Sequence, residues 1–254
     1  MTWWPFARND LNTKNLTTVP IIFVPGLMGS RLQLQGMTWD PDAGPSFYMQ
    51  WNWYHLETKR TALNHKNPCT VMDLTKDNGI PCVASAFYGK FLKALAKKKF
   101  PAAKTPVYAV GYDWRKSNED SATAVKDRIA EILEAEKANR FVLISHSMGG
   151  LVSRAMFKQY EEIAAKATGV IHVAQPAAGA VVLYRRLFTG MQPELDGSDA
   201  VSKILNNAFG KTPAETAALY AVMPGPMQLL CTNHYHYNDD VWHVRHWWAR
   251  RDQD

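Results

Sequence analysis

The sequence has few cysteines, no long apolar run and only a small excess of one charge. Three cysteines in 254 residues are too few for a disulfide framework. No stretch approaches the roughly 18 apolar residues of a transmembrane helix. The first residues, MTWWPFARNDLNTKN, lack the apolar core of a signal peptide. We therefore expect a cytoplasmic protein, or a secreted one if the N-terminus is misassigned.

The charge balance also excludes a class of partner. The chain has 29 Lys and Arg against 23 Asp and Glu, a net charge of +6, and apart from residues 97–99 the basic residues are scattered. Nucleic-acid binding needs a concentrated basic surface, so no nucleic acid is expected. The composition is that of a globular protein, and a domain of this length can bury a full core without disulfides or metals.

Apolar runs alternate with amphipathic segments along the chain. The predicted strands are residues 20–24, 107–110, 141–144 and 169–173, and the predicted helices are 88–100, 121–139 and 151–163. The strand runs are β-branched or aromatic and apolar on both faces, which is typical of strands buried in a parallel sheet. This alternation predicts an α/β fold with a mostly parallel sheet and helices on both faces.

Two regions interrupt this alternation. Residues 36–86 mix Trp, Tyr and Phe with Pro, Asp and Asn and show no clean period. Their rings either pack a long loop onto the body or form a lid that contacts lipid, and both interpretations stay open. Residues 181–225 hold two predicted helices, 198–209 and 213–223, which suggest a second cap region.

The strand at residues 141–144 leads into Ser145-His146-Ser147-Met148-Gly149-Gly150 and then directly into a helix. A strand, a sharp turn and a helix are the context of a nucleophile elbow, whose flanking residues must be small. Ser147 is the candidate nucleophile, with Ser145 where glycine is commonest. The alternative interpretation is a buried polar turn.

A serine nucleophile also needs donors for the negative charge that develops on the substrate oxygen. The segment Pro25-Gly26-Leu27-Met28-Gly29 follows the first strand, and its glycines allow a close approach of the backbone. We predict that the N–H groups of Leu27 and Met148 form the oxyanion hole. A plain tight turn is the alternative for this segment.

Three motifs in this order, VPGLMGSRL, GYDWR and SHSMGGLVSR, resemble the lecithin:cholesterol acyltransferase-like branch of the α/β-hydrolases. The resemblance runs from about residue 19 to about residue 230. It implies an α/β-hydrolase fold and serine-dependent acyl transfer from lipid esters to an alcohol or to water. It assigns the nucleophile to Ser147 and the oxyanion donors to Leu27 and Met148. No cofactor and no metal are expected.

The same resemblance bears on two further features of the chain. The block Tyr112-Asp113-Trp114-Arg115 matches a family block that we interpret as structural or pocket-lining, without a catalytic role. The family has a disulfide-tied lid, for which Cys69 and Cys82 are the candidates. Without an export signal we expect this pair to stay reduced.

The sequence departs from the family pattern after the fourth strand. The order Ser, acid, His needs further strands, and these C-terminal strands are predicted to be missing. We divide the chain into a hydrolase domain, 1–230, and an atypical tail, 231–254, whose composition a shifted reading frame would explain. Asp239 or Asp240 with His243 or His246 would be a noncognate acid and base. The tail histidines lack recognisable metal-ligand spacing.

Neither of the other histidines near the elbow is predicted to act as the base. His146 is expected to point away from the Ser147 hydroxyl, and His172 is expected to be a core residue with its polar atoms satisfied. Three functions stay open. The first is a serine lipase, phospholipase or O-acyltransferase that binds lipid and touches a membrane surface. The second is an inactive hydrolase-like protein that binds lipid or a partner, and the third is an esterase of small substrates.

Overall fold

The computed structural model describes residues 18–98, 103–191, 208–210 and 212–232. Its main sheet has four parallel strands: β1 (Ile21–Val24), β5 (Val107–Ala109), β6 (Phe141–His146) and β7 (Ala167–Val173). Their order across the sheet is β5-β1-β6-β7, so each connection crosses over a face. Ile22 pairs with Tyr108 on one side and with Leu143 on the other. All four predicted strands are confirmed, within a few residues at their ends.

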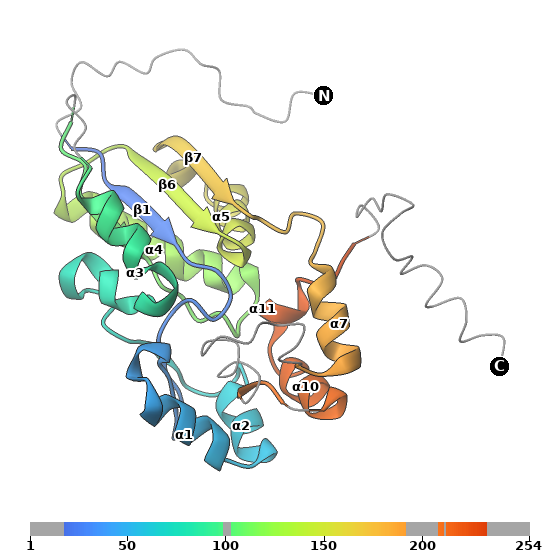
Figure 1. Cartoon of the computed structure of the whole chain (residues 1–254). Helices are drawn as coiled ribbons and strands as arrows, with labels where there is room; N and C mark the ends of the chain where they lie inside the picture. The colour runs from blue at the N-terminus through green and yellow to red at the C-terminus, as the bar shows by residue number, and fades with distance from the viewer. Residues whose placement is uncertain (1–17, 99–102, 192–207, 211, 233–254) are drawn as a thin grey trace.

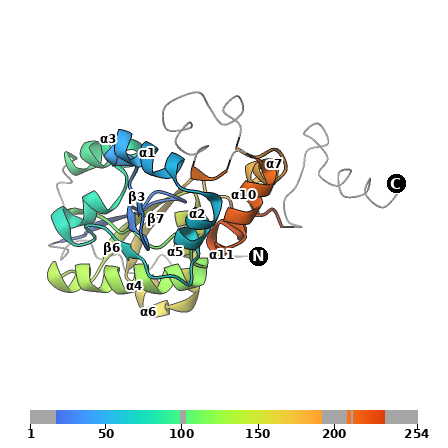
Figure 2. The same ribbon diagram turned by 90° about the horizontal axis from the view of Figure 1, so that it is seen from below.

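Helices cover both faces of this sheet, as predicted. They are α3 (Ser85–Ala96), α4 (Asn118–Ala135), α5 (Met148–Gln159) and α6 (Glu161–Ala164). Figure 2 shows α3 on one side of the sheet and α4 on the other. Successive side chains of a strand point to opposite faces. Ile21 and Phe23 therefore join the cluster under α3, whereas Ile22 and Val24 join the cluster with α4 and α5.

Both α3 and α4 begin and end earlier than their apolar stripes predict. The hydroxyl of Ser117 accepts a hydrogen bond from the Asp120 N–H and caps α4. The carboxylate of Asp42, distant in sequence, accepts from the N–H groups of Ser85 and Ala86 at the start of α3. The polar residues that cap a helix set its first turn, and an apolar period does not include them.

β7 corrects one expectation about burial. Ile171 and Val173 are 53% and 47% exposed, because this strand is the last one in the sheet as described. The prediction that this strand is buried on both faces is therefore wrong. The prediction that His172 is a core residue is wrong for the same reason, since it lies in the exposed part of β7.

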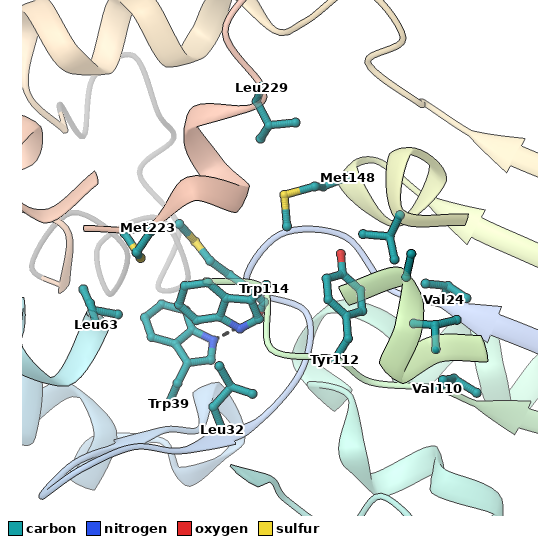
Figure 3. Packing of buried hydrophobic residues seen from close by; sticks show 14 of the residues in the cluster. Val24, Leu32, Trp39, Leu63, Val110, Tyr112, Trp114, Met148, Met223 and Leu229 are labelled. Carbon is teal, nitrogen blue, oxygen red and sulfur yellow. Dashed lines mark hydrogen bonds between the residues drawn. The ribbon is translucent and has the colours of Figure 1, made fainter. Parts of the chain in front are cut away.

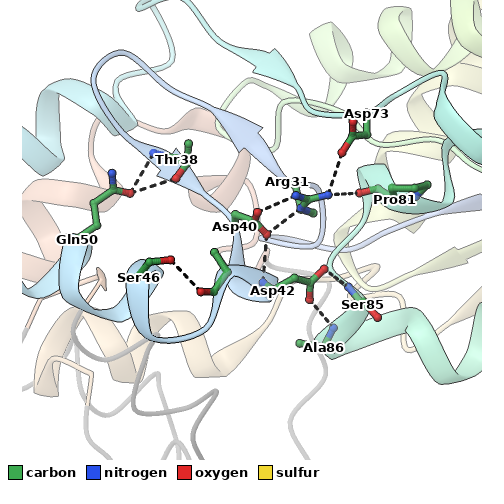
Figure 4. Close-up of polar contacts among 11 residues, drawn as sticks. Arg31, Thr38, Asp40, Asp42, Ser46, Gln50, Asp73, Pro81, Ser85 and Ala86 are labelled. Carbon is green, nitrogen blue, oxygen red and sulfur yellow. Dashed lines mark hydrogen bonds and ion pairs between the residues drawn. The ribbon is translucent and has the colours of Figure 1, made fainter.

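The segment between β1 and α3 folds into short elements rather than one long loop. They are β2 (Leu32–Gln33), β3 (Thr38–Trp39), η2 (Pro41–Ala43), α1 (Pro45–Trp53), α2 (Leu56–Leu63), β4 (Thr70–Val71) and η3 (Lys76–Cys82). β2 pairs with β3 and β4 in a small antiparallel sheet. The guanidinium of Arg31 joins these pieces through Asp40, at 2.7 and 2.8 Å, and Asp73, at 3.2 Å (Figure 4).

The aromatic residues of this segment divide between two surfaces. Trp39 and Trp51 are fully buried, and the Trp39 ring lies 5.3 Å from that of Trp114 (Figure 3). On the outer face of α1, Met49 is 65% exposed and Trp53 is 85% exposed. The first interpretation, rings that pack the segment onto the body, therefore describes the inner face only.

The predicted second cap region, residues 181–225, contains α7 (Val181–Thr189), α10 (Pro213–Tyr220) and the start of α11 (Pro224–Met227). In Figure 1 these helices lie with α1 and α2 beyond the carboxyl ends of the strands. Most of the predicted helix at 198–209, and all of the tail from residue 233, lie outside the described residues. In the part of the chain that is described, no helix has the length and apolar character needed to cross a membrane.

Candidate active site

Ser147 lies between the end of β6 and the start of α5 with a strained backbone. Its φ of 50° and ψ of −125° place it in a region that glycine favours. Such a conformation costs on the order of 1–3 kcal/mol and persists where the surroundings hold it. Here the Ser147 N–H donates to the Val173 carbonyl at 2.9 Å, and the Gly150 N–H donates to the Ser147 carbonyl at 2.9 Å. This half-buried serine has the geometry of a nucleophile elbow.

Two glycines let the elbow and the loop after β1 approach each other. A Cβ atom on Gly149 would collide with the carbonyl oxygen of Pro25. A Cβ atom on Gly26 would lie 2.9 Å from the Cβ of Ser147, closer than such atoms pack. The close packing of β1, the loop and α5 therefore requires glycine at both positions.

The predicted oxyanion donors lie on either side of this contact. Leu27 and Met28 form a tight turn that the Gly29 N–H closes on the Gly26 carbonyl at 3.0 Å. Met28 has a φ of 63°, a second strained non-glycine residue beside the elbow. Within the described residues, neither the Leu27 N–H nor the Met148 N–H donates a hydrogen bond. The oxyanion hole requires two such unpartnered donors, and the assignment of Leu27 and Met148 to it stays a prediction.

The two histidines near the elbow each have another partner. His146 Nδ1 lies 3.0 Å from the hydroxyl of Tyr88, on the α3 side of the sheet. His172 Nδ1 lies 2.6 Å from the hydroxyl of Ser145. Burial lowers the pKa of His146, whereas partial desolvation on β7 and then the charge of Arg154 lower that of His172. The Nδ1 atom of each ring is thus hydrogen-bonded to a group other than Ser147.

Among the residues that the structure describes, no side chain forms a hydrogen bond with the Ser147 hydroxyl. The other candidates for acid and base, Asp239, Asp240, His243 and His246, lie outside the described residues. The described part also contains no group of His, Cys, Asp or Glu able to hold a metal ion.

Neither Cys69 nor Cys82 offers a competing nucleophile. No disulfide joins Cys69 and Cys82. Burial is the largest cause that raises the pKa of each thiol to about 12. Because the thiolate is the reactive form, both side chains are poor nucleophiles at neutral pH.

The residues of the GYDWR motif occupy structural positions. The Tyr112 hydroxyl donates to the Pro25 carbonyl at 3.0 Å. The fully buried Arg115 binds Asp113 through two hydrogen bonds of 2.8 Å. Its guanidinium also donates to three carbonyls at and after the end of α2, those of Ala62, Asn64 and Asn67. This motif therefore fastens the inserted segment to the loop beside Ser147.

Two residues at the site are absent from the sequence-based prediction. The Tyr88 hydroxyl accepts a hydrogen bond from the Gly26 N–H at 3.0 Å, and the Trp39 indole N–H donates to the Met28 carbonyl at 2.8 Å. The first contact joins residues 62 positions apart and the second joins residues 11 apart. Tyr88 belongs to the apolar stripe of a helix, so its spacing alone indicates only a buried ring.

A parallel sheet covered by helices on both faces, with a strained serine between a central strand and a helix, defines an α/β-hydrolase fold. The sequence profile of the family described as "Lecithin:cholesterol acyltransferase" matches residues 77–246, about two thirds of the chain. The chain belongs to this family. The matched range ends at residue 246, whereas the motif-based resemblance ended near residue 230, so the two boundaries differ.

A solved structure described as the Tle4-Tli4 complex contains a similar chain, with a TM-score of 0.70 and 20% sequence identity. The similarity covers 87% of this chain and 56% of that one, so this chain spans little more than half of its length. At this identity it supports the fold alone. A second solved structure is phospholipase PlaB from Legionella pneumophila, with 15% sequence identity over 80% of this chain and 32% of that one. Its TM-score of 0.33 is too low to support a comparison. No curated protein sequence matches the chain.

Proposed function

We propose that this chain catalyses serine-dependent acyl transfer from a lipid ester to an alcohol or to water. The observation that carries the proposal is the strained Ser147 beside two N–H groups, those of Leu27 and Met148, that have no partner within the described residues. Such a group of donors stabilises the negative charge of a tetrahedral intermediate. Family membership supports the lipid ester as the acyl donor.

In the proposed reaction the Ser147 oxygen attacks the ester carbonyl carbon as its proton passes to a general base. The carbonyl oxygen becomes an oxyanion that accepts hydrogen bonds from the N–H groups of Leu27 and Met148. The intermediate then expels the alcohol, which takes up the proton, and leaves an acyl-serine. A second alcohol or water attacks this ester and regenerates the serine. The base is a residue outside those described, or one supplied by a partner.

The same proposal includes peripheral contact with a lipid surface through α1. Its sequence, PSFYMQWNW, carries no charged residue. Phe47 and Trp51 face the core, whereas Met49 and Trp53, one helical turn apart, are mostly exposed. Trp suits the boundary between water and hydrocarbon. The exposed face of α1 is therefore the part of the cap that we expect to meet lipid.

A serine-directed fluorophosphonate tests the proposal directly. We expect rapid labelling of the purified chain, no labelling of Ser147→Ala, and unchanged labelling of Ser46→Ala, an exposed serine that donates only to the Ala43 carbonyl. Circular dichroism shows whether each variant is folded. A folded chain that does not react would favour the second function, an inactive hydrolase-like protein that binds lipid or a partner.

The ester substrate separates the lipid hydrolase from an esterase of small molecules. We expect turnover of nitrophenyl esters to rise with acyl-chain length, and Ser147→Ala to abolish it, because only the tip of the elbow carries the nucleophile. Equal turnover of short and long esters would instead support the third function. Turnover that persists undiminished in Ser147→Ala would contradict the assignment of the nucleophile.

A further inference from the structure

Two tyrosine hydroxyls form hydrogen bonds with the same peptide unit, the one that joins Pro25 to Gly26. Tyr112 donates to the Pro25 carbonyl oxygen at 3.0 Å, and Tyr88 accepts from the Gly26 N–H at 3.0 Å. The peptide bond is planar and trans, so its C=O and N–H point in opposite directions. The two hydroxyls therefore hold this plane from opposite sides and oppose its rotation.

The next peptide unit contains the Gly26 carbonyl and the Leu27 N–H. The Gly26 carbonyl accepts from the Gly29 N–H at 3.0 Å, which fixes the direction of the Leu27 N–H in the same plane. The Trp39 indole holds the other end of the turn at the Met28 carbonyl. The direction of the free donor is thus set by hydrogen bonds at its own peptide unit, at the preceding Pro25–Gly26 unit and at the Met28–Gly29 unit.

Burial makes these hydrogen bonds costly to lose. Tyr112 is 1% exposed and Tyr88 is 9% exposed. The Tyr88 ring also packs against Gly29, where an added Cβ would lie 2.8 Å from Cε2 of the ring. A buried N–H or C=O that loses its partner destabilises the local conformation, whereas an exposed one is satisfied by water.

The Tyr88 hydroxyl contacts a second group, the ring of His146. Because the Tyr88 oxygen accepts from the Gly26 N–H, its own hydrogen is available to His146 Nδ1, 3.0 Å away. If Nδ1 accepts this hydrogen, His146 carries its own hydrogen on Nε2 and is neutral. Burial lowers the pKa of His146, which agrees with a neutral ring. Tyr88 therefore joins the loop after β1 to the residue that precedes Ser147.

We propose that Tyr88 and Tyr112 are positioning residues, which aim the Leu27 N–H at the oxyanion of the acyl-transfer reaction. This inference rests on the proposed function, because it needs the reaction at Ser147. Neither hydroxyl touches the substrate: both act through the Pro25–Gly26 peptide unit. A misdirected donor weakens the hydrogen bond that strengthens in the transition state, so the effect falls on kcat rather than on KM.

The kinetic test uses Tyr88→Phe, Tyr112→Phe and the double variant, with turnover of a long-chain nitrophenyl ester. We expect each single variant to lower kcat by about 10- to 100-fold without a change in KM. The double variant should lose less than the product of the two single losses, because both hydroxyls act through one peptide unit. Tyr108→Phe is the matched control, since its hydroxyl donates to Glu136 at 2.6 Å, and it should keep full activity.

A second measurement does not depend on activity. Amide hydrogen exchange should show a protected Gly26 N–H in the wild-type chain and in Tyr108→Phe. In Tyr88→Phe the same N–H should exchange at least about tenfold faster, while the amides of β1 stay protected.

The two measurements separate the possible failures. Unchanged exchange at Gly26 in Tyr88→Phe, or kcat values within about twofold of wild type for both single variants, would overturn the positioning role. If the folded wild-type chain neither labels nor turns over ester, the proposed function fails. A protected Gly26 would then show that the hydroxyls are structural only, which also overturns the inference.

Discussion

Ser145, His146 and Ser147 are consecutive, yet their side chains meet different parts of the molecule. The Ser145 hydroxyl contacts His172 on β7, and the His146 ring contacts Tyr88 on α3. Neighbouring side chains of a strand point to opposite faces, so the first two residues cannot share a partner. Ser147 follows the last residue of β6 and has a φ of 50°, so the alternation of the strand does not extend to it. Adjacency in the sequence therefore does not make His146 the base of this serine.

The lowered pKa of His146 predicts how the stability of the protein depends on pH. Burial lowers its pKa, so folding disfavours the protonated ring. An unfolded histidine takes up a proton near pH 6.5, whereas the folded ring does so only at lower pH. Between these two pKa values the unfolded state binds more protons, so the free energy of unfolding falls as the pH falls.

We expect the melting temperature to drop less in His146→Gln than in the wild-type chain when the pH is lowered from about 7.5 to about 5.5. Thermal melts by circular dichroism over this range measure the difference. Gln keeps an acceptor for the Tyr88 hydroxyl, which limits other effects of the substitution. Identical pH slopes for the two proteins would show that His146 is not held neutral by the fold.

At the scale of elements, α1 has two faces with different surroundings. Phe47 and Trp51 on its inner face pack against the Trp39 ring, at 5.1 and 5.3 Å between ring centroids. Its outer face carries exposed apolar side chains and no charge. A single helix, which lies beyond the carboxyl ends of the strands (Figure 1), thus fastens the inserted segment to the body and carries exposed apolar side chains.

The prediction at this scale concerns the outer face of α1. Met49→Ser together with Trp53→Ser should weaken binding to phosphatidylcholine vesicles by at least about tenfold, because burying one large apolar side chain contributes roughly 1.5–3 kcal/mol. Co-sedimentation with vesicles measures the binding. Phe91→Ser, an exposed ring on α3, is the matched control and should bind normally. Unchanged binding of the double variant, or an equal loss in the control, would contradict the lipid contact.

At the scale of the whole molecule, the inserted segment and the sheet share one core. The larger hydrophobic cluster contains Trp39 and Trp51 of the insertion, Val24 and Leu143 of the sheet, and Tyr220 of the second cap region. Figure 3 shows Trp39 and Trp114 side by side, with Met223 of the second cap nearby. A shared core predicts that these parts unfold together.

We therefore expect coincident urea transitions by far-UV and near-UV circular dichroism, which report helices and packed aromatic rings. Trp39→Ala should lower the free energy of unfolding by about 3–5 kcal/mol and shift both transitions together. A near-UV transition at a lower urea concentration than the far-UV one would instead show that the insertion unfolds separately.

The sequence predicted those features that depend on residues close together in the chain. Apolar runs located β1, β5 and β6 to within a few residues, because a strand buried in a parallel sheet excludes most polar side chains. The same pattern located β7, although the second half of that strand is exposed. The small residues around Ser147 and the glycines at 26 and 29 located the two tight turns, because only small residues fit them. These local patterns were sufficient for the α/β class and for the site residues that we propose.

Only the tertiary structure decided which distant residues meet at those turns. The hydroxyls of Tyr88, on α3, and Tyr112, after β5, meet at the Pro25–Gly26 peptide unit. No periodic pattern of apolar residues indicates that these distant residues are in contact. The exposed edge of β7 and the contact of His172 with Ser145 likewise follow from strand order and register, and the contact of His146 with Tyr88 follows from the packing of α3 on the sheet. The physical reason is that local sequence restricts the conformation of a few consecutive residues, whereas contacts between elements depend on how the whole chain packs.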